Sequence, residues 1–387
     1  MTIVIAGAGL SGLTLAAHLT RRPPRCEVLI VDDGGKDITA AGWGSWSDRP
    51  GLLDTAARHH WDRVHVHALG RSRLLDLGAY RYRYVRGADL AATVTPMLES
   101  APGFRRVRGH VDDIVEAGVE AGVGTGGAAR VVVDGEPTEA RWVFDSVLGP
   151  SDPPPADAVL VFRGWHLETE AEVFDPRVPT LFDFRTPRSV GASFVYVLPF
   201  GGRHALVEHT TFAAPAVACV AADSDTQRAA LAEYLDTVLR VGRYRVEREE
   251  AAALPLSAQP VRRRRGHVLA IGTAAGLLKP STGYAYERIQ RDSVAIADSL
   301  AEHGHPFAVA EPSRRHRLLD GALLDVITAR PSELERAFAR LFDRSSAEPV
   351  LRFLDERTSV REEAALFTAL PAVEYARAAA GRWRRNR

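Results

Sequence analysis

Two glycine-rich segments near opposite ends of the chain have the residue types and spacing of phosphate-binding loops. In the first, Gly7-Ala-Gly9-Leu-Ser-Gly12 follows a short apolar run and opens an apolar-periodic stretch. Gly7 permits a tight turn, Gly9 lets a pyrophosphate approach the backbone, and Gly12 lets helix and strand pack closely. Asp32 lies 20 residues beyond Gly12, where an acid can accept hydrogen bonds from ribose hydroxyls. The pattern predicts a dinucleotide site, and a glycine turn that binds nothing is the alternative.

The second segment runs from Ile271 to Gln290 and reads IGTAAGLLKPSTGYAYERIQ. It follows an apolar run and so places another helix-start loop after a strand, which suits the ribityl and pyrophosphate region of a flavin. NAD sites do not need such a late segment, and FAD therefore fits the two loops better than NAD. A surface turn that contains a lysine is the alternative. The candidate contact residues of this segment are Gly272, Thr273, Gly276, Pro280, Thr282 and Gly283.

Carboxylates in the middle of the chain are candidates for acid and base chemistry. Asp183 precedes Arg185 by two residues, and the arginine could pair with it and keep it ionised. Glu249 and Glu250 form an adjacent pair of which one could face a cavity, although exposed acidic pairs are common. The two cysteines lack a partner pattern and the histidines lack a defensible ligand geometry, so no metal site is predicted.

The elements expected to position these residues begin with a βαβ unit. Strands are expected at Thr2–Ile5 and Cys26–Val31, and the helix between them ends at Arg22-Pro-Pro because proline lacks the amide hydrogen. An antiparallel hairpin is expected between Asp112 and Phe144. A strand-rich block is expected at 159–212, where Gly201-Gly202 turns one hairpin. Helices are expected at Thr226–Arg240, at Ala285–Leu300 and over most of the chain after Pro312.

This order predicts an α/β protein with a Rossmann-type FAD-binding fold, an inserted β-sheet substrate domain and a helical C-terminal region. Residues 1–150, including the hairpin, are expected to form the first portion of the FAD-binding domain. Residues 151–260 are expected to form the β-rich substrate and catalytic part, and residues 261–310 return to the FAD-binding domain. Residues 311–387 are expected to form the helical region, a candidate membrane contact.

Composition excludes several classes of function. The chain is 46% hydrophobic and 25% charged, and its 49 basic residues balance 49 acidic ones, so nothing in it calls for a nucleic-acid partner. No apolar run reaches 18 residues, which excludes a conventional membrane-spanning helix, and the start MTIVIAGAG is expected to be structural sequence and not a secretion signal. The last twelve residues place five arginines around Trp383, which could contact an anionic membrane; a solvated tail is the alternative. We expect a cytoplasmic, peripherally membrane-associated protein.

The segment from Ile271 to Gln290 is also very similar to the corresponding stretch of the bacterial flavin-dependent lycopene β-cyclases. Thr273 stands where many flavin hydroxylases carry an Asp, and a difference there is expected in a family that does not use its flavin to activate oxygen. The resemblance covers nearly the whole chain, because other blocks match the family in the same order: WGSW (43–46), YRYRYVRGADL (80–90), VFDS (143–146), GWHLETEAEVFDP (164–176), TLFDFR (180–185), FVYVLPFGGRHALVEHTTF (194–212), REEAAALP (248–255) and RFLDERTS (352–359).

The resemblance implies cyclisation of the ψ-ends of lycopene to β-ionone rings, through γ-carotene to β-carotene, as an isomerisation without net electron transfer. It implies FAD that is active in its reduced form, NAD(P)H as the reductant, and a long apolar polyene or prenyl chain as substrate. The acidic position of the family falls at Glu208. Protonating a carbon–carbon double bond needs an acid kept neutral by burial, which raises a carboxyl pKa. An outward-facing glutamate paired with an arginine is the alternative. Candidate aromatic faces for the carbocation, or else packing residues, are Trp43, Trp46, Tyr80 and Tyr82.

Several positions depart from the pattern of the family. Val147 stands where Arg is common, Leu160-Val161 where a Gln-His pair is frequent, and Ala252 where Gly is usual. These departures leave open a different prenyl or meroterpenoid chain that is cyclised by the same protonation. A flavin monooxygenase or reductase is a further alternative, and so is a flavin-binding protein without catalytic activity.

Overall fold

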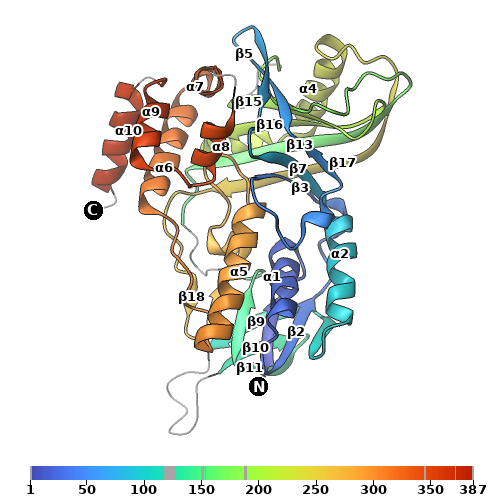
Figure 1. Cartoon of the computed structure of the whole chain (residues 1–387), viewed down its shortest axis with the longest axis vertical. Helices are drawn as coiled ribbons and strands as arrows, with labels where there is room; N and C mark the ends of the chain where they lie inside the picture. The colour runs from blue at the N-terminus through green and yellow to red at the C-terminus, as the bar shows by residue number, and fades with distance from the viewer. Residues whose placement is uncertain are drawn as a thin grey trace.

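The computed structural model describes residues 2–116, 128–149, 152, 154–186, 190–343, 346–370 and 372–385. Its nucleotide-binding part is built on six strands: β1 (Thr2–Ala6), β2 (Glu27–Asp32), β8 (Phe104–Arg108), β12 (Trp142–Asp145), β18 (Arg264–Arg265) and β19 (Val268–Ala270). Their order is β18-β19-β12-β1-β2-β8, and they form the lower half of the molecule in Figure 1. All neighbours pair in parallel except β18 and β19, so the βαβ opening is confirmed.

Both faces of this sheet are covered, which explains why its strands are continuous apolar runs. The face with Ile3 and Ile5 packs against helices, and the face with Val4 and Ala6 packs against a three-stranded antiparallel sheet. The helices are α1 (Leu10–Arg21), α2 (Gly87–Glu99) and α5 (Tyr286–His303). The three strands are β9 (Val111–Glu116), β10 (Ala129–Val133) and β11 (Glu136–Ala140).

An antiparallel hairpin was predicted between Asp112 and Phe144. The prediction is correct for β9, β10 and β11, but its range wrongly includes β12. Phe144 lies on β12, which pairs in parallel with β1 in the six-stranded sheet. Its short apolar run Trp142–Asp145 is fully buried, and a run of that kind does not reveal by itself which sheet it joins. The Gly-Ala-rich turn at 117–127 lies outside the described residues.

A second, seven-stranded sheet forms the upper half of Figure 1 in the order β17-β13-β16-β15-β14-β5-β6. Its strands are β5 (Arg63–Ala68), β6 (Arg71–Asp76), β13 (Ala158–Thr169), β14 (Thr180–Asp183), β15 (Ala192–Pro199), β16 (His204–Ala213) and β17 (Tyr244–Leu256). The hairpin predicted around Gly201-Gly202 is confirmed, because β15 and β16 pair on either side of it. β5 and β6 lie within residues 1–150, so the expected boundary at residue 150 does not separate the two sheets.

A small sheet of β3 (Gly42–Ser47), β7 (Arg81–Arg86) and β4 (His59–Trp61) lies between the two halves. Side chains of a strand alternate between its faces. Trp46 and Tyr82 therefore join the core of the large sheet, while Trp43 and Val85 join the core of the nucleotide-binding part. The small sheet thus forms the partition between the expected cofactor and substrate regions.

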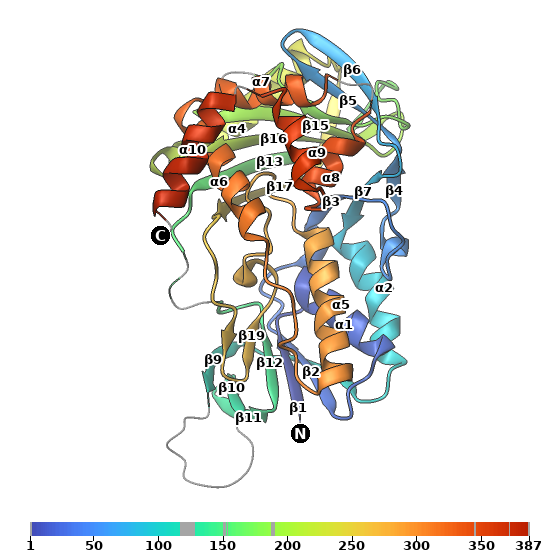
Figure 2. The same ribbon diagram turned by 60° about the vertical axis from the view of Figure 1, so that its left-hand side comes forward.

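Helices cover both faces of the large sheet. α4 (Ser224–Thr237) packs on one face. The C-terminal helices pack on the other and lie beside the sheet in both views (Figures 1 and 2). Leu324, Ile327 and Leu334 are fully buried there, and each side chain contributes about 1.5–3 kcal/mol to stability. These helices are α6 (Arg314–Ala329), α7 (Ser332–Leu341), α8 (Glu348–Leu354), α9 (Val360–Phe367) and α10 (Ala372–Arg385).

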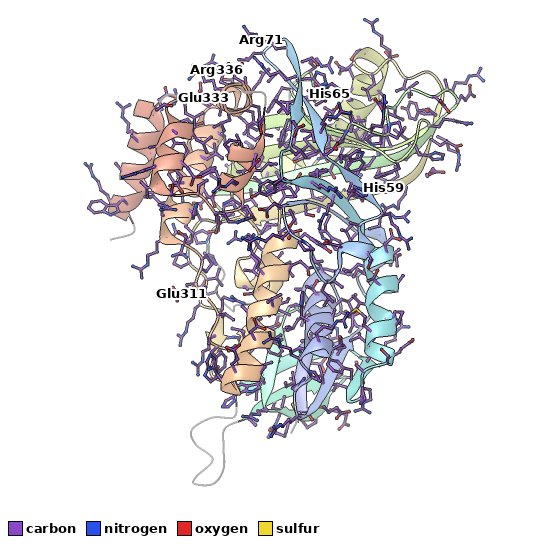
Figure 3. The ribbon with its side chains drawn as sticks, viewed as in Figure 1. His59, His65, Arg71, Glu311, Glu333 and Arg336 are labelled. Atoms are coloured by element: carbon purple, nitrogen blue, oxygen red, sulfur yellow. The ribbon has the colours of Figure 1, made fainter. Side chains whose placement is uncertain are left out.

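Short elements complete the chain. They are α3 (Ala218–Ala221) and the 3-10 turns η1 (Ile38–Ala40), η2 (Asp54–Ala56), η3 (Pro215–Val217) and η4 (Gly272–Ala275). Figure 3 shows Glu333 and Arg336 of α7 close to the hairpin of β5 and β6, which carries His65 and Arg71. Within the described part of the chain, none of the helices combines the length and the apolar character needed to cross a bilayer.

Candidate active site

Gly7, Gly9 and Gly12 form the loop between β1 and α1. Gly7 has a φ of +97°, and a Cβ on Gly12 would lie 1.9 Å from the Gly7 carbonyl oxygen. A Cβ on Gly9 would meet no atom within 4 Å, so the space above this residue is open. Gly9 is the N-cap of α1 and offers no side-chain cap, which leaves the first amides of the helix for a ligand. The loop therefore fits a pyrophosphate.

The second glycine-rich segment lies against the first. Gly272 has a φ of +64°, and a Cβ on it would stand 2.5 Å from the Ser11 hydroxyl oxygen at the start of α1. Gly276 follows η4 with a φ of +69°, and Thr273 between these glycines is exposed. Two loops from opposite ends of the chain thus border one site.

Asp32 lies at the C-terminal end of β2 beside the same loop. Its carboxylate accepts hydrogen bonds from the amides of Ala8 (2.7 Å) and Gly34 (2.8 Å). A carboxylate has about four lone-pair sites, so two bonds leave capacity for ribose hydroxyls. The position of Asp32 therefore fits the ribose of a dinucleotide.

The turn from Lys279 to Gly283 connects the second loop to the large sheet. The Gly283 amide donates to the Lys279 carbonyl oxygen at 2.8 Å, Pro280 is buried, and Thr282 is half-buried. Gly283 has a φ of +75°, and a Cβ on it would stand 2.3 Å from Leu160 Cδ2 on β13. The expected flavin loop therefore touches the expected substrate sheet directly.

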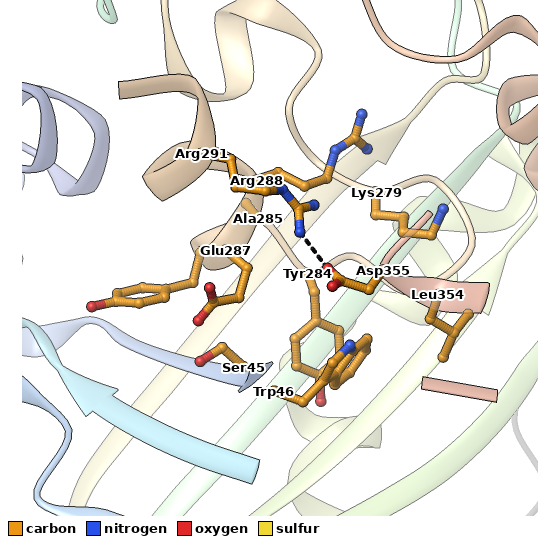
Figure 4. Close-up of a pocket in the computed structure, with 11 residues that line it drawn as sticks. Ser45, Trp46, Lys279, Tyr284, Ala285, Glu287, Arg288, Arg291, Leu354 and Asp355 are labelled. Atoms are coloured by element: carbon orange, nitrogen blue, oxygen red, sulfur yellow. Dashed lines mark hydrogen bonds and ion pairs between the residues drawn. The ribbon is translucent and has the colours of Figure 1, made fainter. Parts of the chain in front are cut away.

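A cavity of about 20 Å³ lies beside this turn, between β3 and the start of α5 (Figure 4). Trp46 and Tyr284 line it together with Ser45 and Glu287. The buried Ser45 hydroxyl has no hydrogen-bond partner among the described residues, and burial raises the pKa of Glu287 to about 7. The cavity has room for about one water molecule and marks the junction of the two halves.

Glu208 lies on β16, on the face of the large sheet that meets the C-terminal helices and the small sheet. Leu206 and Phe212 on the same face belong to the main apolar core. Glu208 itself is half-buried. Burial and, secondly, the charge of Glu250 raise the pKa of Glu208 to about 8, against a hydrogen bond from the Thr210 hydroxyl (3.1 Å). The carboxyl is therefore neutral at pH 7 and can act as an acid.

Aromatic side chains from three elements gather beside Glu208. The Tyr284 hydroxyl lies 3.1 Å from that of Tyr82 on β7 and 3.2 Å from that of Tyr196 on β15. The ring centroids of Trp46 and Tyr284 are 4.4 Å apart. Burial raises the pKa of all three tyrosines well above 10, and the charge of Glu208 adds to the effect, which places its carboxyl near each of them.

Two of the four aromatic residues singled out in the sequence do not belong to this group. Trp43 points to the opposite face of the small sheet and packs in the nucleotide-binding core. The Tyr80 hydroxyl lies 3.4 Å from an Arg357 guanidinium nitrogen, away from the tyrosine cluster. Tyr196 and Tyr284 were not predicted as site residues, although the alternation of β15 and the end of the second glycine-rich segment could have indicated them.

Glu249 and Glu250 on β17 point to opposite faces, as neighbours on a strand do. Glu250 shares the face of Glu208, and its carboxylate lies 3.3 Å from His166 Nε2 and 3.5 Å from an Arg248 guanidinium nitrogen. Glu249 accepts hydrogen bonds from Arg228 and from the Trp165 indole at 2.8 and 2.9 Å on the other face. Of the acidic pair, Glu250 is the member that the structure brings to Glu208.

Asp183 is not brought to Glu208. It pairs with Val195, which pairs with His209, so it lies on the α4 face of the sheet. Burial acts to raise the pKa of Asp183, but hydrogen bonds from Arg185 (2.7 Å) and Tyr234 (2.7 Å) outweigh burial and hold that pKa below its usual range. The expected Arg185 pair is present, and it balances the charge of Asp183 on this face. Sequence spacing alone did not reveal its face.

One group of described residues has ligand atoms close enough for a metal ion, although no metal site was predicted. Atoms of Glu168, His204 and Glu247 lie within 4.8 Å of one another at the surface. Arg245 already pairs with Glu168 at 2.9 Å and with Glu247 at 3.0 Å. The carboxylates therefore have cationic partners within the protein.

Comparison with known proteins supports the family seen in the sequence. Residues 2–380 match the family model described as lycopene cyclase protein. The chain is 24% identical over 395 residues to the lycopene beta-cyclase of Pseudescherichia vulneris, covering 96% of this chain and 94% of that protein. It is 26% identical over 368 residues to an uncharacterized carotenoid cyclase of Deinococcus radiodurans, covering 88% and 82%.

Solved structures share the fold at low identity. A flavin-dependent brominase has a TM-score of 0.62 at 14% identity, covering 97% of this chain and 99% of that chain. HpxO of Klebsiella pneumoniae, solved in complex with FAD, has a TM-score of 0.54 at 15% identity, covering 95% and 98%. These likenesses confirm the Rossmann-type FAD-binding fold with its inserted β-sheet part and helical C-terminal region. Because the family model spans residues 2–380, the chain belongs to the lycopene cyclase family.

Proposed function

We propose that this member of the lycopene cyclase family is a lycopene β-cyclase. It cyclises the ψ-ends of lycopene to β-ionone rings, giving γ-carotene and then β-carotene. The observation that carries the proposal is the place of Glu208 on an apolar face lined by tyrosines, where burial raises the pKa of its carboxyl. A relative of similar length bears the name lycopene beta-cyclase.

Glu208 starts the reaction by protonating the terminal double bond of a ψ-end. The neighbouring double bond then attacks the tertiary cation and closes the ring, and loss of the C6 proton gives the β-ring. An ionised glutamate has no proton to give, so the raised pKa of Glu208 supports this role at neutral pH.

The aromatic group beside Glu208 would stabilise the carbocation and exclude water. Trp46, Tyr82, Tyr196 and Tyr284 present ring faces and edges within one buried cluster. A cation over an aromatic face gains about 0.5–2 kcal/mol. Because water would capture the cation as an alcohol, the apolar surroundings also protect the product.

FAD would occupy the two glycine-rich loops. When bound in its reduced form, it supplies negative charge close to the cation, without net electron transfer. NAD(P)H is the proposed reductant. The residues proposed to hold FAD are Gly7, Gly9, Gly12, Asp32, Gly272, Thr273, Gly276, Pro280, Thr282 and Gly283.

We further propose that the protein is cytoplasmic and takes its substrate from the bilayer. It would contact the membrane through α10. On α10, Trp383 is 50% exposed, and Arg377 and Arg384 are exposed. Arg382 is not part of this contact, because it is buried and pairs with Asp325 at 2.7 Å. Flotation with anionic liposomes tests the contact, and protein that stays in the soluble fraction would contradict it.

A second candidate is the same chemistry on another prenyl or meroterpenoid chain. Leu160 favours it, because this apolar side chain faces the substrate region at a position where the family often has a polar residue. Shorter prenyl chains would reach Glu208 from the same face. Product analysis with lycopene separates the two candidates.

The test is expression in a lycopene-accumulating bacterium. Wild type is compared with Glu208→Gln and with Glu233→Gln, a control at an exposed position on α4. We expect β-carotene from the wild type and the control, and lycopene from Glu208→Gln with its FAD content unchanged. Persistence of lycopene in all three strains, with FAD bound, would make lycopene the wrong substrate. Substrate-dependent NADPH oxidation would instead indicate a monooxygenase or reductase.

A further inference from the structure

Glu208 and Glu250 flank a residue without a side chain. Gly164 on β13 pairs with Glu208 on β16 and with Glu250 on β17, and directly paired residues share a face of the sheet. A Cβ on Gly164 would lie 3.3 Å from Glu208 Cβ, 3.2 Å from Glu250 Cγ and 2.8 Å from Leu206 Cδ1. Two strand spacings separate the glutamate Cα atoms by about 10 Å. The missing side chain of Gly164 therefore lets Leu206 and the two glutamate side chains approach one another over this position.

The two carboxyls have different surroundings. Glu208 receives a hydrogen bond from the neutral Thr210 hydroxyl and faces the tyrosine cluster. Glu250 lies beside His166 and the cationic Arg248, which is itself anchored by the Ala40 carbonyl oxygen. Where two neighbouring carboxyls differ in this way, one is suited to give a proton and the other to accept one.

Resting on the proposed cyclisation, we propose that Glu250 is the catalytic base that removes the ring proton and returns it to Glu208. The Glu208 O–H bond breaks as a C–H bond forms at the terminal double bond, and the ring closes. The C6–H bond then breaks as an O–H bond forms on Glu250. Transfer of this proton across Gly164 to Glu208 restores both groups, so no proton or electron is gained or lost.

The surroundings of Glu208 favour return of the proton to it. Burial and the charge of Glu250 raise the pKa of Glu208 to about 8, so the returning proton reaches a carboxyl that holds it at neutral pH. The C6 proton and the newly protonated carbon belong to one ring, which fits two glutamates that flank the same glycine on neighbouring strands. Loss of the base should therefore change where the proton leaves, and not whether the ring closes.

The test compares the flavin-reduced holoenzyme of wild type, Glu250→Gln and Glu250→Asp with lycopene in liposomes. Glu249→Gln is the matched control, because Glu249 is the adjacent residue on the opposite face. For Glu250→Gln we expect β-ring formation to fall about a hundredfold. The remaining product should carry ε- or γ-rings or hydroxylated ends, since the cation then loses a different proton or takes up water. Glu250→Asp should restore part of the β-ring product. A slow enzyme that still makes β-rings alone would overturn the proposal.

A second measurement does not depend on lycopene. Infrared difference spectra over a pH titration follow the protonated carboxyl band, which is assigned to Glu208 by its loss in Glu208→Gln. We expect this band to persist to higher pH in wild type and Glu249→Gln than in Glu250→Gln, because removing the Glu250 charge makes Glu208 more acidic. An unchanged titration would show that the carboxyls do not act as a pair. If wild type does not convert lycopene but the titration of the Glu208 band still shifts in Glu250→Gln, then lycopene is the wrong substrate while the coupling of Glu208 and Glu250 is supported.

Discussion

Gly283 and Leu160 touch so closely that a Cβ on the glycine would stand 2.3 Å from Leu160 Cδ2. Gly283 ends the second glycine-rich loop, and Leu160 lies on β13 of the large sheet. This contact joins the proposed flavin loop to the proposed substrate face. Val161, the next residue, points away and packs with Ala213 and Ala221 on the other face. Of the two adjacent departures from the family pattern, only Leu160 lies on the proposed substrate face.

Leu160→Ala and Val161→Ala separate these two roles. Both remove buried apolar atoms and should lower the free energy of unfolding by about 2–4 kcal/mol. Only Leu160→Ala should change the cyclisation rate or the ratio of γ-carotene to β-carotene, because it alone opens space beside Gly283. Denaturant unfolding and pigment chromatography measure the two effects. An equal change of products in Val161→Ala would contradict the assignment of faces.

Gly9→Ala and Gly12→Ala test the phosphate loop. Gly9 has a φ of −74° and open space above it, so alanine should fold normally there and yet obstruct the approach of the pyrophosphate. Gly12→Ala places a Cβ 1.9 Å from the Gly7 carbonyl oxygen, which should cost about 3 kcal/mol or more of stability. Flavin absorbance of the purified proteins and thermal unfolding distinguish the cases. Full FAD occupancy in Gly9→Ala would argue that the cofactor lies elsewhere.

Cyclisation should fall as the pH rises through about 8, where Glu208 loses its proton. The pH profile of turnover at saturating substrate measures this limb. Glu250→Gln should shift it to lower pH, because the negative neighbour that raises the Glu208 pKa is gone. A profile that stays flat from pH 6 to pH 10, or a limb unmoved in Glu250→Gln, would place the acid at another residue.

The free energy of unfolding should also depend on pH because of Glu208. The folded-state pKa of Glu208 is raised above its unfolded value. Its contribution to the free energy of unfolding is therefore fully present below the unfolded pKa and is lost as pH rises toward 8. Glu208→Gln removes this loss and should be more stable than wild type at pH 8, by about 1–2 kcal/mol. Guanidinium unfolding at pH 5 and pH 8 measures the difference, which should be smaller at the lower pH.

Asp183→Asn should weaken the fold without changing the products. The pKa of Asp183 is lowered in the folded state. Its contribution to the free energy of unfolding is therefore present above the unfolded pKa and is lost as pH falls through the folded-state pKa. At pH 7 the variant leaves Arg185 without its charge partner and should lose about 1–3 kcal/mol of stability. The loss should shrink below about pH 4, where the carboxyl of the unfolded chain begins to be protonated, and disappear below the lowered pKa of the folded state. A shift to other ring products would return Asp183 to the active site.

Local sequence patterns predicted the opening βαβ unit, the hairpin at Gly201-Gly202 and the later helices, but none of the elements between β2 and β9. The glycine spacing at residues 7–12, the apolar runs beside it and the proline after Arg22 depend on contacts within a few residues, so they predicted β1, α1 and β2. The run Trp142–Asp145 was assigned to the wrong sheet. The sequence of a short buried strand does not show which sheet it joins until its partner strand is known. The same limit applied to β5 and β6, which join the large sheet far from their neighbours in sequence.

The acidic residues of the candidate site were predictable from the sequence, but their arrangement was not. By itself the sequence determined the family, the two glycine-rich loops and the presence of acids at positions 183, 208 and 250, because these depend on residue identity and spacing. Tertiary structure alone decided which acids meet. Strand register turned Asp183 to the α4 face and set Glu208 and Glu250 on either side of Gly164. A shift of one residue in register would reverse every side chain on a strand, and only the pairing of distant strands determines that register.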